Sequence, residues 1–210
     1  MLSLSIFTSS QTISVALYEN RRLIKFSKNK IHQNKIDSIF LLLKELVLKD
    51  WSNLSKIFFS VGPASYTALR SIKSIAEGIS AVTQAKVLKL TEFEIYLANF
   101  KTFKPNVIVF YEAANGKFFY QQFKPYDRIY SASSRLYHGD ISVIKRFILK
   151  MSKEEIEIIS NSRKSLSLFR DFPNIIVHHL NPCSRKLAEA AFQGYGKIDR
   201  DILYHHTYYE

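Results

Sequence analysis

Residues 57–70 read Ile-Phe-Phe-Ser-Val-Gly-Pro-Ala-Ser-Tyr-Thr-Ala-Leu-Arg and carry the clearest structural signal in the chain. The apolar start of this stretch is typical of a buried strand, and Gly62 with Pro63 marks its end. Ser65 then stands where a helix can begin, and apolar residues follow it at helical spacing. The stretch therefore predicts a strand, a tight turn and an amphipathic helix over residues 65–82.

The segments before and after this stretch complete one mixed α/β pattern. Alternating apolar and polar residues predict three antiparallel strands ahead of the first helix, and the later strand at 57–61 is expected to run parallel to the first. Thr91 and Glu94 have the spacing of a helix capping box. The predicted elements, in the order β-β-β-α-β-α-β-α, are strands 2–8, 12–18 and 22–27, helix 33–49, strand 57–61, helix 65–82, strand 86–90 and helix 91–100.

The second half of the chain repeats this pattern less clearly. A polar, proline-containing break at residues 101–105 separates it from the first half. We expect two lobes, 1–101 and 102–210, in an α/β fold with mixed sheets flanked by helices. The predicted elements are a hairpin of strands 107–111 and 118–123, helix 142–150, strands 156–160 and 175–180, and helix 183–192.

Composition indicates a folded, basic protein. Thirty Lys and Arg against eighteen Asp and Glu leave a net charge of +12, and hydrophobic residues make up 47% of the 210 residues. The charge is divided evenly, +6 in residues 1–100 and +6 in 101–210, so a compositional bias explains it better than a dedicated nucleic-acid patch. A single cysteine, Cys183, and the lack of a signal peptide or an 18-residue apolar run favour a cytoplasmic protein without a membrane segment.

Several short motifs resemble the bacterial TsaB (YeaZ) family. Residues 62–70 are similar to its signature Gly-Pro-Gly-Ser-Phe/Tyr-Thr-Gly-Leu-Arg, with alanine replacing two glycines. The motif residues kept are Gly62, Pro63, Ser65, Tyr66, Thr67 and Arg70. Four weaker resemblances follow in the family's order, at Ile6 to Leu17, at His32 to Ile36, at Glu112 to Phe119 and at Leu203-Tyr204.

The resemblance implies a fold and a role. The fold would be the actin-like/ribonuclease-H-like (ASKHA) class, which agrees with the element order read from the sequence. The role would be that of a non-catalytic subunit, without a cofactor, that partners a TsaD-like catalytic subunit and a TsaE-like ATPase. Together these proteins install the threonylcarbamoyl group on the adenosine next to the anticodon of tRNA. The tRNA would be reached through the complex.

The first two helices are the expected partner surface. The family pairs with TsaD, or with itself as a homodimer, through the helical face of its first lobe. A helix on a sheet buries one face, which we assign in the first helix to Ile36, Phe40, Leu43 and Val47. Apolar residues beyond that face would suit an interface. This assigns to the interface Ile39, Leu42, Leu46, Ala68, Ile72, Ile75 and Ile79.

Departures from the family bear on catalysis. Catalytic members of the fold place an acidic residue near the nucleotide and its metal, and Phe7 stands at that position here. A phenyl ring cannot hold an ion, so we expect Phe7 in the core or an interface and no catalytic or metal site in this lobe. Glu112 stands where the family has Asp, while Ala114 and Asn115 replace common arginines.

Two other functions stay open, and the remaining polar candidates are weak. The chain could be a nucleotide-binding enzyme of the same fold that uses residues 8–10, or a module that binds tRNA directly through its positive charge. The histidine pairs 178–179 and 205–206 put neighbouring side chains on opposite faces of a strand, which disfavours a zinc site. Cys183 has no evident histidine base, and His32 is equally consistent with a partner contact and a surface position.

Overall fold

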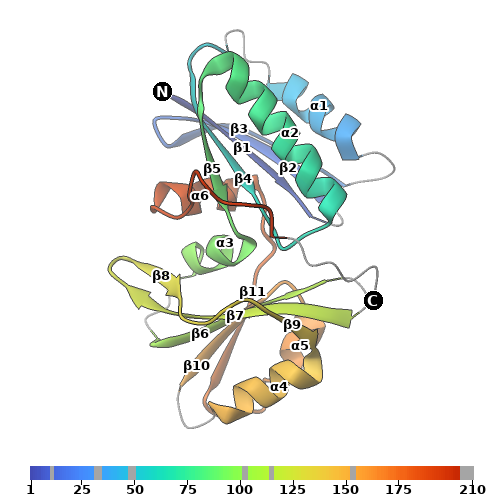
Figure 1. Cartoon of the computed structure of the whole chain (residues 1–210), viewed down its shortest axis with the longest axis vertical. Helices are drawn as coiled ribbons and strands as arrows, with labels where there is room; N and C mark the ends of the chain where they lie inside the picture. Colours follow the sequence, from blue (N-terminus) through green and yellow to red (C-terminus); the bar gives the residue numbers. More distant parts are fainter. Residues whose placement is uncertain are drawn as a thin grey trace. The chain divides into compact units, whose positions relative to one another are not determined.

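The computed structural model describes residues 1–9, 12–30, 35–46, 51–100, 104–113, 116–151 and 155–203. The chain divides into two compact units (Figure 1). Unit 1 comprises Met1–Ile95 and Pro182–Glu210, and unit 2 comprises Tyr96–Asn181. The predicted boundary between residues 101 and 102 is therefore displaced, and the assignment of the whole C-terminal segment to the second lobe is wrong. The physical reason is that the last helix packs on the first sheet.

Unit 1 contains a five-stranded mixed sheet with the order β3-β2-β1-β4-β5. β1 pairs antiparallel with β2, and β2 with β3, whereas β4 and β5 continue parallel to β1. This arrangement confirms the predicted meander and the parallel return of the fourth strand. The strands are β1 (Leu2–Thr8), β2 (Thr12–Glu19), β3 (Arg22–Lys30), β4 (Leu54–Ser60) and β5 (Lys86–Leu90).

Helices cover both faces of this sheet. α1 (Lys35–Leu46) and α2 (Tyr66–Thr83) contact one face, and α6 (Ser184–Phe192) contacts the other (Figure 1). α3 (Glu92–Ala98) begins in unit 1 and ends in unit 2. Its capping box is confirmed, because Thr91 N donates to Glu94 Oε2 at 2.8 Å and Glu94 N donates to Thr91 Oγ1 at 3.1 Å. Among the described helices, none has the length and apolar character that a membrane span requires.

Unit 2 repeats the plan around β6. Its sheet has the order β11-β10-β6-β7-β8, with β9 paired to β7, and β10 and β11 run parallel to β6. β8, β9 and α5 are absent from the sequence prediction because these short segments carry no alternating or helical apolar pattern. The elements are β6 (Asn106–Glu112), β7 (Lys117–Tyr126), β8 (Ile129–Ala132), β9 (Tyr137–Asp140), α4 (Ile141–Lys150), β10 (Ile156–Ser160), α5 (Arg163–Ser167) and β11 (Ile175–His179).

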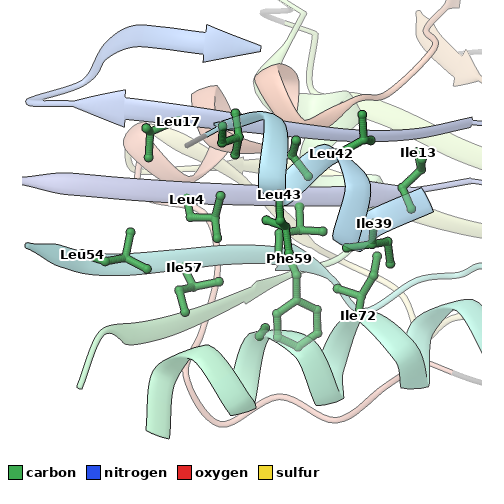
Figure 2. Close-up of a cluster of buried hydrophobic side chains, with 14 of the residues drawn as sticks. Leu4, Ile13, Leu17, Ile39, Leu42, Leu43, Leu54, Ile57, Phe59 and Ile72 are labelled. Atoms are coloured by element: carbon green, nitrogen blue, oxygen red, sulfur yellow. The ribbon is translucent and has the colours of Figure 1, made fainter. Parts of the chain in front are cut away.

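Each unit has its own hydrophobic core. In unit 1, alternate residues of the strands meet the inner faces of α1 and α2, and Figure 2 labels Leu4, Ile13 and Phe59 from the sheet with Ile39 and Leu42 from α1. In unit 2, inward residues of the sheet meet α4 and α5 in a cluster rich in isoleucine and phenylalanine. The prediction of two mixed sheets flanked by helices is confirmed.

Candidate partner interface

The turn after β4 fixes the start of α2. Ser60 Oγ accepts a hydrogen bond from Gly62 N at 3.2 Å, and Gly62 O accepts one from Glu92 N at 2.7 Å. Gly62 has φ +105°, its peptide bond to Pro63 is cis, and both residues are buried. A Cβ on Gly62 would lie 2.9 Å from the carbonyl oxygen of Leu203. The two residues therefore shape the turn and are not available to a partner.

The first turn of α2 is open to solvent. Ser65 occupies the N-cap position, where the sequence predicts the helix to begin, but its side chain makes no capping hydrogen bond. Its carbonyl oxygen accepts the helical bond from Leu69 N at 2.9 Å. Ser65, Tyr66 and Thr67 are exposed. The polar part of the motif thus faces outward at the end of the helix.

A groove of about 1310 Å³ lies along α1 and α2 within unit 1. Its walls combine apolar side chains from both helices with small residues of α2, and one cation from each helix lies among them. The lining residues are Phe40, Leu43, Lys44, Trp51, Tyr66, Thr67, Arg70, Ser71, Ser74, Ile75, Gly78, Ile79, Val82 and Thr83.

Large apolar side chains in this groove are exposed. Phe40 is 54% exposed, Tyr66 41% and Val82 84%. Gly78 lies mid-helix with no neighbouring atom within 4 Å of an added Cβ, so the floor of the groove is open there. The Arg70 guanidinium lies 5.3 Å from the Tyr66 ring centroid, which covers part of that ring with a cation. An exposed apolar groove with charged residues beside it is typical of a protein interface.

The structure corrects most of the predicted interface set. Five of its residues are buried in the isolated chain and cannot contact a partner, namely Ile39, Leu42, Leu46, Ala68 and Ile72. Ile75 and Ile79 are half-buried and line the groove. The expected core position of Phe40 is also wrong, because its side chain is exposed. Ile36 and Val47 lie outside the residues whose side chains are described.

The error on α1 is one of helical phase. Two apolar stripes fit the helical period, and the stripe of Ile39, Leu42 and Leu46 packs on the sheet. Leu43 of the other stripe is buried in the same cluster, so its expected core position is confirmed. Lys44 gives a usable signal, because it stands four residues after Phe40 and therefore shares its face. A lysine on that face indicates that the face is exposed to solvent.

The other positions carried by the resemblance have structural roles. Phe7 is fully buried on β1, so the expectation of a core position is confirmed. Glu112 is half-buried at the end of β6, where its N donates to Asn161 Oδ1 at 2.8 Å and its Oε2 accepts from Ser165 Oγ at 3.4 Å. Ala114 and Asn115 lie outside the described residues.

Two buried carboxyl groups have perturbed titration. Burial raises the pKa of Glu92 well above its usual value, and neither of its oxygens has a hydrogen-bond partner. In unit 2, burial also raises the pKa of Glu157, and the nearby Lys104 opposes that shift. Burial lowers the pKa of His178, whose Nε2 lies 3.8 Å from Glu157 Oε2. These groups are therefore closer to neutral than exposed ones would be.

The remaining candidates that the structure describes lie in separate surroundings. His178 stacks near Phe100 while His179 contacts Asn161 and Arg163, so the two histidines have separate surroundings. Cys183 occupies the N-cap of α6. In the part of the chain that the structure describes, no three His, Cys, Asp or Glu side chains are grouped to hold a metal ion. His32 and the pair at 205–206 lie outside that part.

Comparison with solved structures gives a clear match in fold. YeaZ from Pseudomonas aeruginosa superposes with a TM-score of 0.71 over 97% of this chain and 99% of its own, at 15% identity. The chain has a YeaZ-like fold. No family model and no curated protein matches the sequence.

The YeaZ-like fold belongs to a wider class. Inorganic polyphosphate/ATP-glucomannokinase from Arthrobacter sp. matches with a TM-score of 0.54 and 10% identity, over 91% of this chain and 97% of its own. The ethanolamine utilization protein EutJ from Carboxydothermus hydrogenoformans matches with 0.52 and 8%, over 92% and 90%. The predicted actin-like (ASKHA) fold class is confirmed.

Proposed function

We propose that this chain is a non-catalytic scaffold subunit that binds a TsaD-like catalytic subunit through the groove along α1 and α2. The complex, with a TsaE-like ATPase, would carry out threonylcarbamoyl modification of tRNA in the cytoplasm. The exposed apolar groove on a YeaZ-like fold is the observation that carries this proposal. Exposure of Phe40 and Val82 to water does not stabilise the isolated chain, whereas burial of both against a partner helix would stabilise the complex.

The lining of the groove supports a helical partner. The backbone of α2 is accessible along the groove because its residues there are small, at Ser71, Ser74 and Gly78. Side chains of an approaching helix can therefore pack close to it. Phe40 and Val82 stand at its apolar walls, and Lys44 and Arg70 add cations. We expect a partner helix with an apolar stripe and acidic flanks.

Phe7 supports a scaffold over the alternative of a nucleotide-binding enzyme. Its ring fills a fully buried site on β1, where a carboxylate would be required to hold an ion near a nucleotide. Calorimetric titration with ATP and Mg²⁺ distinguishes the two functions. Heat of binding to the isolated chain would favour the enzyme.

Partner binding is testable with exposed residues alone. Leu42 and Ile72 are unsuitable sites because a buried aspartate would unfold unit 1. We expect the double variant Phe40→Asp and Val82→Asp to fold normally and to weaken binding to the TsaD-like protein of the same organism at least tenfold in surface plasmon resonance.

Matched control substitutions lie in unit 2. Tyr126 is 71% exposed and Leu168 48%, and both are far in sequence from the groove. Tyr126→Asp and Leu168→Asp together should leave the affinity unchanged. Absence of binding by the unmodified chain at micromolar concentration, or equal affinity of the groove and control variants, would refute the proposal. A concentration-dependent dimer abolished by the groove variant would identify a second copy as the occupant.

A further inference from the structure

The face of unit 1 opposite the groove is built around α6. Ser184 N donates to Ser14 Oγ at 2.9 Å, and Ser5 Oγ donates to Ser184 O at 2.7 Å. Phe192, at the other end of α6, contacts the rings of Tyr18 and Phe58 with centroid distances of 5.2 and 5.4 Å. These bonds and ring contacts hold α6 firmly on the sheet.

Cations gather at both ends of α6. Lys28 lies opposite Ser14 on the neighbouring strand, and Ser14 contacts Ser184 at the start of α6. The next two residues of α6, Arg185 and Lys186, are also cations. At the other end Lys56 lies two residues from Phe58, on the same face, and its cross-strand neighbour is another lysine. We call the α6 face the surface that contains Arg21, Lys28, Lys56, Lys86, Arg185 and Lys186.

Aromatic rings fix two of these cations in place. The Arg185 guanidinium lies 5.7 Å from the Phe26 centroid, and the Arg21 guanidinium lies 5.8 Å from the Phe192 centroid. Both rings are half-buried, while both arginines are exposed. Stacking limits side-chain freedom and leaves the guanidinium donors free to bind an anion.

Like charges lie close to one another around Lys186, which is flanked by Lys28 and Arg185. Burial lowers the pKa of Lys186, Cys183 and Glu189 raise it, and the smaller influences of Lys28 and Arg185 lower it. Repulsion among cations on one face disfavours the unliganded surface. A bound polyanion would relieve that repulsion.

We propose that the α6 face binds the phosphate backbone of a folded RNA. The two groups of cations are separated by a nine-residue helix, about 13 Å long, so one phosphate cannot satisfy both and a polyanion can. The choice of RNA, with tRNA as the probe, rests on the proposed function. Unit 1 would then use one face of its sheet for a protein and the other for RNA.

The test is tRNA binding by the full chain without any partner. Fluorescence anisotropy with labelled tRNA between about 50 and 200 mM salt should give a log–log slope of roughly −3 to −5, as expected for four to six neutralised phosphates. We expect Lys28→Gln with Arg185→Gln to reduce that slope by about two, and Lys56→Gln with Lys86→Gln to do the same. The four changes together should weaken binding at least tenfold.

Control substitutions separate this surface from total charge. Lys124→Gln with Arg128→Gln removes two exposed cations from unit 2 and should leave the slope unchanged. Equal loss from the control pair, salt-independent binding, or no tRNA binding would overturn the inference. Sedimentation with phosphatidylserine vesicles but no binding to tRNA would also overturn it and assign the face to membranes.

The same proteins distinguish this inference from the proposed function. Variants of the α6 face should retain affinity for the TsaD-like subunit, which also shows that they are folded, while Phe40→Asp with Val82→Asp should retain tRNA binding. Loss of RNA binding with intact partner binding would be a failure of the inference alone. RNA binding without any partner binding would be a failure of the proposed function alone.

Discussion

The connection from β4 to α2 in unit 1 and the connection from β10 to α5 in unit 2 begin with the same contact. β4 and β10 each lie parallel beside the central strand of their sheet. Each ends in a buried serine that accepts a hydrogen bond from the backbone two residues later, Ser60 from Gly62 at 3.2 Å and Ser160 from Ser162 at 3.1 Å. The two units are thus related in local detail as well as in strand order.

The two connections then diverge. α2 continues for 18 residues and leaves one side open as the groove, whereas α5 stops after five residues. The residue that donates the shared hydrogen bond differs as well, because Ser162 caps α5 through its side chain while Gly62 has a positive φ. The two connections therefore share the serine contact, and the longer helix of unit 1 carries the groove.

Gly62→Ala is the strongest way to break the turn of unit 1. A Cβ there would lie within 3.0 Å of Leu203 O, Ala64 N and Leu69 Cδ1, and the residue has φ +105°. We expect the free energy of unfolding to fall by about 2 to 4 kcal/mol, from backbone strain and steric overlap combined. Urea denaturation of both proteins measures the difference.

Gly78→Ala is the matched control for this change. Gly78 lies inside α2 with open space around a Cβ, so alanine should stabilise the helix by roughly 0.5 to 1 kcal/mol. Equal effects of the two substitutions would show that the geometry of the turn does not matter.

Each unit contains a buried glutamate whose titration makes stability depend on pH, and the two dependences can be compared. A glutamate in the unfolded chain titrates near pH 4.3, whereas burial raises the pKa of Glu92 well above that. Above about pH 4.3 the unfolded chain loses the Glu92 carboxyl proton, while the folded chain keeps it up to its own, higher pKa. The free energy of unfolding therefore falls as pH rises, by up to about 1.4 kcal/mol per pH unit, until the pH reaches the folded pKa.

Glu92→Gln should remove this dependence. The amide is neutral in both states, so its stability relative to the unmodified chain should grow as pH rises above about 4.3. Glu157→Gln in unit 2 should show a smaller growth, because Lys104 opposes the shift there. Denaturation at several pH values measures both, and parallel profiles for Glu92→Gln and the unmodified chain would contradict the expectation.

Sequence periodicity predicts the strands and long helices of both units, and it fails where the physical signal is short or ambiguous. β5 and β10 are predicted at their observed bounds, since apolar runs closed by turn residues leave little freedom. β8, β9 and α5 are four or five residues long and carry no clear apolar pattern, so the sequence does not predict them. The return of α6 to unit 1 depends on contacts between residues about 170 apart, such as Ser14 with Ser184, which local pattern cannot reveal.

The groove is harder to predict from the sequence than the fold. The motif at residues 62–70 correctly led to α2, and Ile75 and Ile79 do line the groove, but an apolar residue on an amphipathic helix can face the sheet or a partner with equal local preference. The packing places Phe40 outward and Leu42 inward, and Lys44 on the face of Phe40 is the one local signal for that orientation. The cations of the α6 face were missed for a related reason, because they come from four strands or turns and one helix.

Alanine at the two strand-end serines has a smaller expected effect than Gly62→Ala and gives the most direct test of the relation between the units. Ser60→Ala and Ser160→Ala each leave a buried backbone N–H unpaired, so each should lower the free energy of unfolding by roughly 1 to 2 kcal/mol. Ser142→Ala, at an exposed site on α4, should change it by less than about 0.5 kcal/mol. Equal losses at Ser60 and Ser160 in urea denaturation would support a common turn. A loss of stability at Ser60 alone would contradict this expectation. It would mean that Asn161 Oδ1 or water replaces the Ser160 hydroxyl as the acceptor in unit 2.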